Sequence, residues 1–148
     1  MTAYTSSYNQ TIELATFSVG DALYGLDILK VKEINKQVEM TLVPQSPKYV
    51  LGVINLRGRI VTVLDLGKKI GLSFAQISKK SRNIIVSAEN EDVGLLVDRI
   101  DDIVLANHDQ ISPPPANIGG VQGRFFEGIF KTDKSLIAVL NLEEVLKK

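Results

Sequence analysis

The sequence predicts a mainly β fold built from two similar halves. Its apolar residues come in short runs rich in β-branched side chains and separated by turn residues, which is the pattern of strands. The stretch GVINLRGRIVTVLDL at Gly52–Leu66 recurs without gaps, in degraded form, as GIFKTDKSLIAVLNL at Gly128–Leu142. A second pair keeps the same order, with YGLDILKVKEI starting at Tyr24 and VGLLVDRIDDI starting at Val93. The chain is therefore expected to be internally duplicated.

Five apolar runs are the predicted strands: Val50–Ile54, Ile60–Leu64, Asn83–Val86, Val93–Val97 and Leu136–Leu140. The first two runs are joined by a tight turn that contains Asn55 and Gly58. Because Gly58 can adopt the positive φ of a type II or primed turn, a β-hairpin is the simplest interpretation. Both faces of the second run are largely apolar, which favours a strand enclosed in a small closed or nearly closed barrel.

Short capped helices are predicted at three places. Asp27 can cap a turn through Ile28, Val31 and Ile34, and Asp65 can cap Leu66–Ile70, with Gly71 placed to end it. Asn141 with Glu144 forms a plausible capping box for a terminal helix of sequence LEEVLKK. Residues 73–82 are polar enough for a surface loop, and residues 1–11 are expected to form a mobile tail.

The composition is that of a folded globular protein and excludes several classes of function. The 148 residues include 17 basic and 17 acidic side chains that are interspersed, so nucleic-acid binding is not expected. Cysteine is absent and His108 is the one histidine, which rules out disulfides and multi-histidine or sulfur-ligated metal sites. No export leader and no apolar run of roughly 18 residues is present, so we expect a cytoplasmic chain without membrane insertion. Neither a metal nor another cofactor is predicted.

Catalytic groups are hard to find in this sequence. Asp98, Asp101 and Asp102 lie close together, but their spacing does not match a calcium loop, and solvated charges on a strand or turn are the simpler interpretation. A small β-barrel hydrolase that uses Asp98 or Asp102 remains as an enzyme alternative, and it would show turnover that those carboxylates carry.

Several motifs in combination resemble the CheW-type chemotaxis coupling (adaptor) proteins. They are YGLDI at Tyr24, the two prolines Pro44 and Pro47, the turn NLRG at Asn55–Gly58 and the VG-VD segment at Val93–Asp98. The resemblance covers about residues 13–145. It implies two pseudo-symmetric five-stranded SH3-like β-barrels that share a core, with short helices and a C-terminal helix. Residues 12–148 would then form one domain of two intertwined barrels, with repeats at roughly 20–80 and 82–148.

The resemblance implies a non-catalytic adaptor that couples transmembrane chemoreceptors to the histidine kinase CheA. Its partners would be the regulatory domain of CheA and the cytoplasmic tips of methyl-accepting chemoreceptors, and the chain alone is expected to be monomeric. A second possibility is an adaptor of the same fold in another receptor-kinase pathway, such as surface motility or second-messenger control. With no kinase or receiver segment after Lys148, a stand-alone adaptor is expected.

The family's partner-binding residues map onto this chain position by position. Ile28, Val31 and Glu33 correspond to its first short helix, and Gly52 and Arg57 to the strand and turn beside it. An Arg at a tight turn could clamp an acidic partner, although Arg57 could instead pair with Glu33 or Glu39 within the molecule. Likewise, Ile28 and Val31 could belong to the core.

A second predicted surface is the family's receptor groove. The residues that map onto it are Ile84, Ile85, Val93 and Gly94, for which a place in the core is an equal alternative. The chain departs from the family pattern at Thr62, where proline is common, and in the loop PPANIGG after Pro113, which lacks an aromatic residue.

Overall fold

The structure is a computed structural model that describes residues 11–36, 39–73 and 75–147. In chain order the strands are β1 (Thr11–Val19), β2 (Ala22–Asp27), β3 (Val31–Lys36), β4 (Val50–Leu56), β5 (Arg59–Asp65), β6 (Arg82–Ala88), β7 (Glu91–Val97), β8 (Arg99–Asn107), β9 (Ile111–Ser112), β10 (Asn117–Ile118), β11 (Val121–Gln122), β12 (Phe126–Lys131) and β13 (Leu136–Leu140). The helices are the 3₁₀ turns η1 (Ile28–Lys30), η2 (His108–Gln110) and η3 (Gly123–Phe125) and the α-helices α2 (Leu66–Lys69) and α3 (Leu142–Leu146). The predicted mainly β fold is confirmed.

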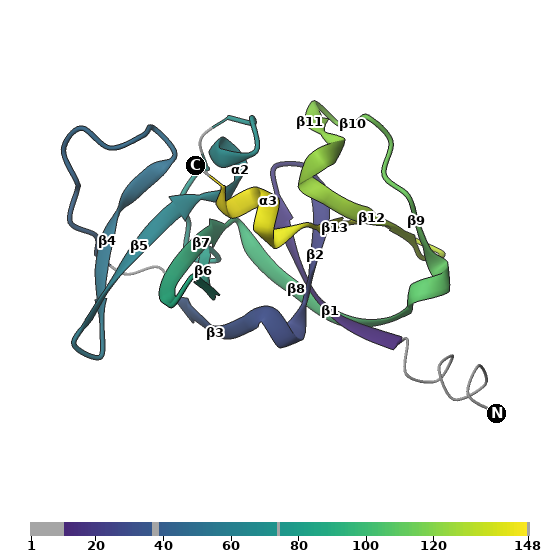
Figure 1. Ribbon diagram of the computed structural model, residues 1–148, viewed down its shortest axis with the longest axis horizontal. Helices are drawn as coiled ribbons and strands as arrows, with labels where there is room; N and C mark the ends of the chain where they lie inside the picture. The colour runs from purple at the N-terminus through teal and green to yellow at the C-terminus, as the bar shows by residue number, and fades with distance from the viewer. Residues whose placement is uncertain (1–10, 37–38, 74, 148) are drawn as a thin grey trace.

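Two sheets make up most of the molecule and lie side by side in Figure 1. Sheet 1 has five strands in the order β3-β6-β7-β5-β4, and sheet 2 has six in the order β8-β1-β2-β13-β12-β9. A two-stranded ribbon of β10 and β11 stands apart from both sheets. Sheet 2 exceeds the expected five strands because the two-residue strand β9 pairs with the edge of β12.

The sequence duplication is also a structural one, and the two copies exchange strands. In sheet 1, β5 runs parallel to β7 with Thr62 opposite Val93. In sheet 2, β13 runs parallel to β2 with Ala138 opposite Tyr24. Thr62 and Ala138 are equivalent positions of the duplication, and so are Val93 and Tyr24. In each sheet the parallel pair therefore joins a strand of one copy to a strand of the other. The division into repeats at 20–80 and 82–148 therefore describes the sequence, and as a domain assignment it stays a prediction.

A close backbone crossing recurs at the same position in both copies. The ladder between β4 and β5 shifts register at Gly52, and the ladder between β12 and β13 shifts at Gly128. A Cβ added at Gly52 would lie 2.5 Å from the carbonyl oxygen of Thr41, and one added at Gly128 would lie 2.5 Å from that of Ser112. Each glycine thus lets a neighbouring segment pass over the bulged strand.

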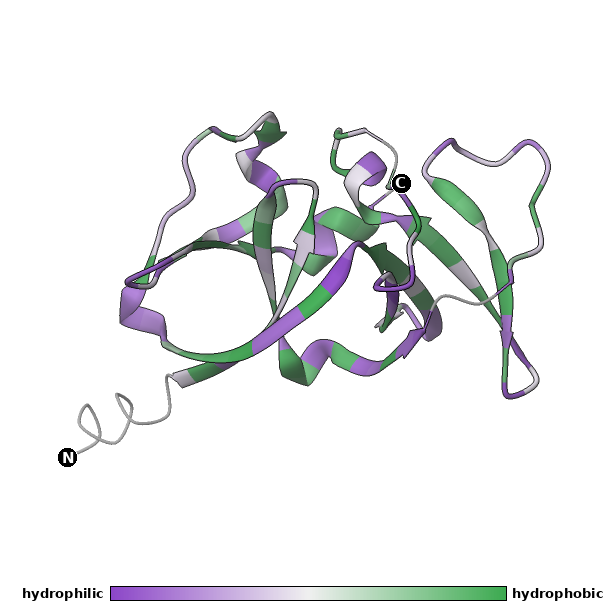
Figure 2. Ribbon diagram, turned by 180° about the vertical axis from the view of Figure 1, so that it is seen from behind, coloured by the Kyte–Doolittle hydropathy of each residue, from purple (hydrophilic) through white to green (hydrophobic). Residues whose placement is uncertain are grey.

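The interior contains three apolar clusters, one within each sheet and one between them. The largest lies between the sheets and includes Phe17, Tyr24, Leu95 and Phe126, so it draws on both copies. The cluster of sheet 1 contains Ile54, Val61, Val63, Ile85 and Leu96, and the cluster of sheet 2 contains Ile12, Leu14, Ala106, Phe130, Ile137 and Val139. Figure 2 shows hydrophobic residues in every large strand, with hydrophilic residues between them on strands such as β8 that have an exposed face.

All three predicted N-caps form, but the capping box predicted at Asn141 is only half present, because the Asn141 amide donates to the Phe125 carbonyl, and one element is shorter than expected. Asp65 Oδ1 accepts a hydrogen bond from the Lys68 amide at 3.2 Å, and Asn141 Oδ1 accepts one from the Glu144 amide at 3.3 Å. Asp27 Oδ1 accepts from the Leu29 amide at 3.0 Å, but the helix that it caps ends at Lys30. The prediction that this turn continues through Val31 and Ile34 is wrong, because the chain enters β3 there and pairs with β6.

The strand predictions are confirmed for all five apolar runs, each of which lies in a strand: β4, β5, β6, β7 and β13. The apolar runs did not predict the other strands, which include β1, β2, β3, β8 and β12, and β1 begins at Thr11, the last residue of the predicted tail. The rest of that predicted tail, residues 1–10, lies outside the described residues.

Candidate functional site

The hairpin between β4 and β5 closes through a two-residue turn that exposes Arg57. Arg57 and Gly58 both have positive φ, 53° and 82°, which is the conformation of a type I′ turn. The Asn55 side chain accepts a hydrogen bond from the Gly58 amide at 2.9 Å and holds the turn in this shape. The predicted roles of Asn55 and Gly58 in the turn are thereby confirmed, and its type is a primed one.

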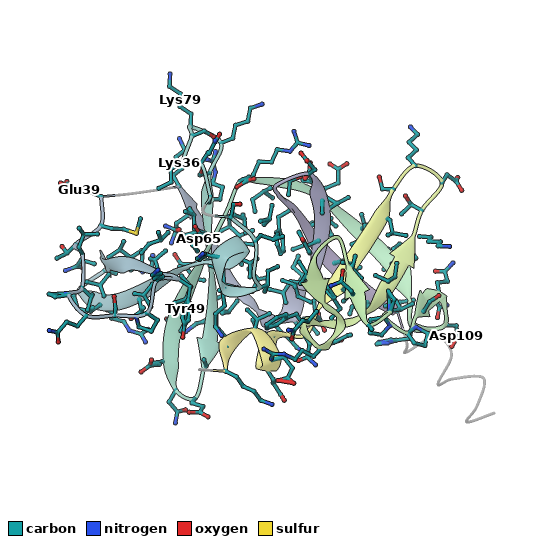
Figure 3. All side chains as sticks on the ribbon, turned by 90° about the horizontal axis from the view of Figure 1, so that it is seen from above. Lys36, Glu39, Tyr49, Asp65, Lys79 and Asp109 are labelled. Carbon is teal, nitrogen blue, oxygen red and sulfur yellow. The ribbon has the colours of Figure 1, made fainter. Side chains whose placement is uncertain are left out.

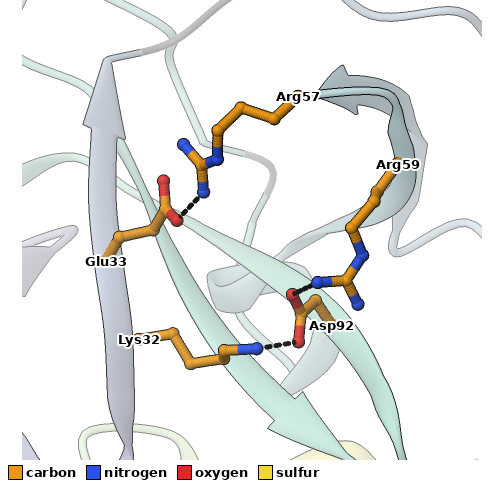
Figure 4. A network of polar contacts seen from close by, with 5 residues as sticks. All are labelled: Lys32, Glu33, Arg57, Arg59 and Asp92. Atoms are coloured by element: carbon orange, nitrogen blue, oxygen red, sulfur yellow. Dashed lines mark hydrogen bonds and ion pairs between the residues drawn. The ribbon is translucent and has the colours of Figure 1, made fainter.

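Five charged residues, Lys32, Glu33, Arg57, Arg59 and Asp92, form a network beside this turn, which we call the charged corner (Figure 4). Arg57 pairs with Glu33. Asp92 accepts from Lys32 Nζ at 2.9 Å through one carboxylate oxygen and contacts the Arg59 guanidinium at 3.3 Å through the other. The residues come from β3, from the β4–β5 turn with the start of β5, and from β7, three places that are far apart in the sequence.

The charged corner helps to close sheet 1 on itself. β3 and β4 are the two outer strands of that sheet, yet the Arg57–Glu33 pair joins β3 to the tip of the β4–β5 hairpin. Thr41, which follows β3, exchanges two backbone hydrogen bonds with Val53 of β4, at 2.9 and 2.8 Å. Both outer strands are therefore linked, as the prediction of a nearly closed barrel from the apolar faces of β5 requires.

The members of the charged corner differ strongly in how far their side chains are exposed. The Asp92 side chain is only 9% exposed and accepts from two cations, whereas the Arg57 side chain is 70% exposed. Hydrogen bonding from Lys32 holds the pKa of the Asp92 carboxyl below its ordinary value, and hydrogen bonding from Arg57 does the same to the pKa of Glu33. Both carboxylates therefore stay charged at neutral pH. The Arg57 guanidinium is held at the surface and keeps N–H donors that the pair with Glu33 does not use.

The structure brings some of the predicted partner-binding residues together and separates others. Glu33 and Arg57 are in contact, which confirms the alternative that Arg57 pairs with Glu33 within the molecule. Val31 and Glu33 lie on β3 instead of on a helix, and Val31 is half-buried against the core between the sheets. Gly52 is buried under Thr41, so its contribution is to the backbone crossing.

The apolar surface beside Ile28 belongs to a different residue from the predicted one. Ile28 on η1 is half-buried, while its neighbour Leu29 is 89% exposed. The prediction placed the exposed apolar side chain at Ile28 and not at Leu29, because the spacing of apolar residues suggested a longer helix than the three-residue turn that forms. The Asp27 cap, which bonds to the Leu29 amide, is a local signal that fixes where this turn begins.

The four residues predicted to line a receptor groove are buried. Ile84 and Val93 belong to the core between the sheets, and Ile85 to the core of sheet 1. A Cβ at Gly94 would already lie 3.3 Å from Ile85 and from Val63. The prediction that these side chains line a surface groove is therefore wrong for this structure, and the alternative of core positions is the correct one. The physical reason is that β6 and β7 are interior strands of sheet 1 with both faces covered.

Three of the five residues of the charged corner, Lys32, Arg59 and Asp92, were not predicted from the sequence. Arg59 and Lys32 are neighbours of predicted site residues, so proximity to Arg57 and Glu33 was the available signal. No such signal existed for Asp92, which lies 60 positions from Lys32 in the sequence. Ile60, which follows Arg59 and is 68% exposed, adds an apolar element to this surface.

The aspartates of the enzyme alternative have structural roles at the junction of β1, β2 and β8. Asp98 accepts from the Gly20 amide at 2.8 Å, and Asp101 accepts from the Ser18 hydroxyl at 2.7 Å. The Asp102 backbone carbonyl accepts from the Thr16 hydroxyl. Among the described residues, no group of three or more His, Cys, Asp or Glu side chains could hold a metal ion.

The fold and the charged corner define a small protein of two β-sheets without a catalytic constellation among the described residues. In the part of the chain that the structure describes, no helix is long and apolar enough to span a membrane. The family model described as the CheW-like domain matches residues 13–148, and the chain belongs to this family. Membership makes it an adaptor of the chemotaxis type rather than an enzyme.

Relatives of known name support this assignment. The chain is 34% identical to the probable chemotaxis protein CheW of Rhizobium etli over 92% of this chain and 88% of the relative. It is 32% identical to the chemotaxis protein CheW of Helicobacter pylori, over 94% and 84% of the two chains. The crystal structure of the scaffolding protein TtCheW from Thermoanaerobacter tengcongensis is similar with a TM-score of 0.85, at 37% identity over 93% of this chain and 88% of that one.

Proposed function

We propose that this chain is a cytoplasmic, non-catalytic adaptor that binds the regulatory domain of the kinase CheA and the cytoplasmic tips of methyl-accepting chemoreceptors. Family membership and the chemotaxis names of relatives that match over most of their length support a scaffolding role. The partners themselves are inferred from that role.

The observation that carries this proposal is the exposed guanidinium of Arg57 on a rigid support. The type I′ turn and the pair with Glu33 restrict the side chain, while 70% of it stays accessible to a partner. An Arg fixed in this way loses little conformational freedom on binding and can pair with carboxylates or carbonyl groups of a partner. The exposed apolar Ile60 beside it gives the mixed apolar and charged character of a protein interface.

The test is a pair of calorimetric titrations, followed by a three-component sedimentation experiment. The purified chain is titrated with the CheA regulatory domain and, separately, with a receptor cytoplasmic fragment from the same organism. The proposal expects saturable binding to each and a complex that contains all three. Binding to neither partner would reject the proposal and favour an adaptor of another receptor-kinase pathway, whereas competition between the two partners would reject simultaneous coupling.

A further inference from the structure

A cluster of cations lies at the end of sheet 1 where β3 finishes and β6 begins, away from the charged corner. It consists of Lys36, Lys79, Lys80 and Arg82, which we call the basic end. Lys36 and Arg82 are directly opposite each other in the ladder between β3 and β6. Figure 3 shows Lys36 and Lys79 projecting from the same end of the molecule.

The turn that precedes β6 holds this arrangement in place. The Ser81 amide donates to the Ser78 carbonyl at 3.1 Å, and the Ser81 hydroxyl accepts from the Ser78 amide at 2.9 Å. The Arg82 guanidinium donates to the backbone carbonyls of Lys79 and Ser81 at 2.9 and 2.8 Å. Lys79 and Lys80 therefore occupy the two central positions of a hydrogen-bonded turn, and their backbone is ordered before any partner binds.

The lysines of the basic end have no acidic partner among the described residues, and unlike the similarly unpaired Lys131 and Lys134 they lie beside a third cation, Arg82. Elsewhere in the described chain, Lys30, Lys32, Arg57, Arg59 and Lys147 all lie in ion pairs with carboxylates. Within the described residues, Lys36, Lys79 and Lys80 have no such pair. In a chain whose net charge is zero, such a group of cations makes the surface at the basic end locally positive.

A hollow of about 370 Å³ adjoins the basic end and adds apolar surface to it. It is lined by Lys80, Arg82, Arg99, Ile100 and Asp101. Its one carboxylate, Asp101, already accepts from Ser18 and contacts Arg99 at 3.5 Å. Ile34 on the same face as Lys36, and Ile77 shortly before the turn, are also exposed. The surface therefore combines cations with isolated apolar side chains.

We propose that the basic end is a docking surface for an acidic segment of a partner protein, one that carries carboxylates beside apolar side chains. This inference rests on the proposed function, because it assigns a second contact to one of the two partners named there. Charge complementarity selects an acidic occupant, and the apolar residues between the cations suit a protein segment better than a continuous run of phosphates.

The test compares a double charge reversal with a matched control. Lys79→Glu/Lys80→Glu reverses the tip of the turn, and Lys131→Glu/Lys134→Glu reverses two exposed lysines of the β12–β13 hairpin that have no ion pair within the described residues. Each variant and the parent chain are titrated with the CheA regulatory domain and with the receptor fragment, at about 50 mM and about 400 mM NaCl, where screening differs strongly. Circular dichroism melting verifies that both variants fold.

The expected result is an affinity for one partner that falls about tenfold or more in the Lys79/Lys80 variant at low salt and less at high salt, with the control unchanged. Wild-type affinity of the Lys79/Lys80 variant for both partners would overturn the inference and leave the proposed function standing. Equal losses in the two variants would also overturn it, because they would indicate a general charge effect. Failure of the parent chain to bind either partner would overturn the proposed function together with this inference. The surface would be reassigned if the parent chain bound anionic vesicles or single-stranded DNA and only the Lys79/Lys80 reversal abolished that binding. In that case the affinity for the protein partners would be unchanged by the reversal.

Discussion

Arg57 and Glu33 form an ion pair that joins the tip of the β4–β5 hairpin to β3, the outer strand on the opposite side of sheet 1. One side chain of this pair is largely exposed and the other is mostly covered. The contact thus combines an internal role, in linking two outer strands, with an external one, in presenting a guanidinium to a partner. Mutations can separate the two roles.

Arg57→Ala is expected to weaken partner binding about tenfold or more while lowering the melting temperature by less than roughly 2 °C. The reason is that an exposed ion pair contributes little to folding, whereas a desolvated Arg in an interface contributes much. Titration with the CheA regulatory domain and a thermal melt measure the two effects, with Lys131→Ala as the exposed control. A large fall in melting temperature would assign Arg57 to stability instead of docking.

Asp92→Asn is expected to destabilise the fold more than Arg57→Ala, lowering the melting temperature by roughly 5 °C. Asp92 is the shared acceptor of Lys32 and Arg59, so its neutralisation leaves two cations facing each other across a mostly covered site. Glu91→Gln, at the exposed neighbouring position, is the matched control. Equal melting temperatures for the two variants would show that the Asp92 contacts add nothing to stability.

Gly52→Ala and Gly128→Ala are both expected to destabilise the protein, by about 1–3 kcal/mol each. At each position the new Cβ would lie 2.5 Å from a backbone carbonyl oxygen, of Thr41 or of Ser112, and backbone atoms relax less easily than side chains. Urea unfolding measures the loss. Parent-like stability of Gly52→Ala, with reduced binding, would instead support the original assignment of Gly52 to a partner surface.

Gly58→Val is expected to destabilise the hairpin by about 1–3 kcal/mol, because a β-branched residue cannot readily adopt the φ of 82° found there. Gly58→Asn is the control, since asparagine tolerates this conformation and a Cβ at this position has open space around it. Urea unfolding of both variants measures the difference. The strain argument would fail if valine and asparagine gave the same stability.

Acid is expected to weaken the charged corner in a defined pH range. The pKa values of Asp92 and Glu33 are both lowered in the folded protein, by Lys32 and Arg57 respectively. The stabilisation that they provide is therefore complete above the ordinary carboxyl range, around pH 4, and is lost as the pH falls through their folded-state values. Melting temperatures measured from pH 7 to pH 2 should decline less steeply for the Asp92→Asn/Glu33→Gln variant than for the parent chain. Parallel curves for the two proteins would contradict this.

Local sequence patterns were sufficient for part of the secondary structure, since eight of the thirteen strands among the described residues lie outside the predicted apolar runs. Apolar runs predicted five strands, and Asp27, Asp65 and Asn141 marked three helix starts, because both signals depend on residues a few positions apart. The predicted secondary structure was wrong where a local pattern of apolar residues fits both a helix and a strand. The apolar spacing after Asp27 fits a helix as well as a strand, and only the pairing of β3 with β6 decides between them.

The sequence by itself determined the duplication, the β4–β5 turn through Asn55 and Gly58, the capped helices and the family. Only the tertiary structure decided that Arg57 meets Glu33, that Asp92 lies between Lys32 and Arg59, and that Ile84 is buried while Leu29 is exposed. The physical reason is the exchange of strands between the two copies. Because β5 pairs with β7 and β13 with β2, the faces that are covered and the charges that meet depend on segments far apart in the chain, which no local periodicity records.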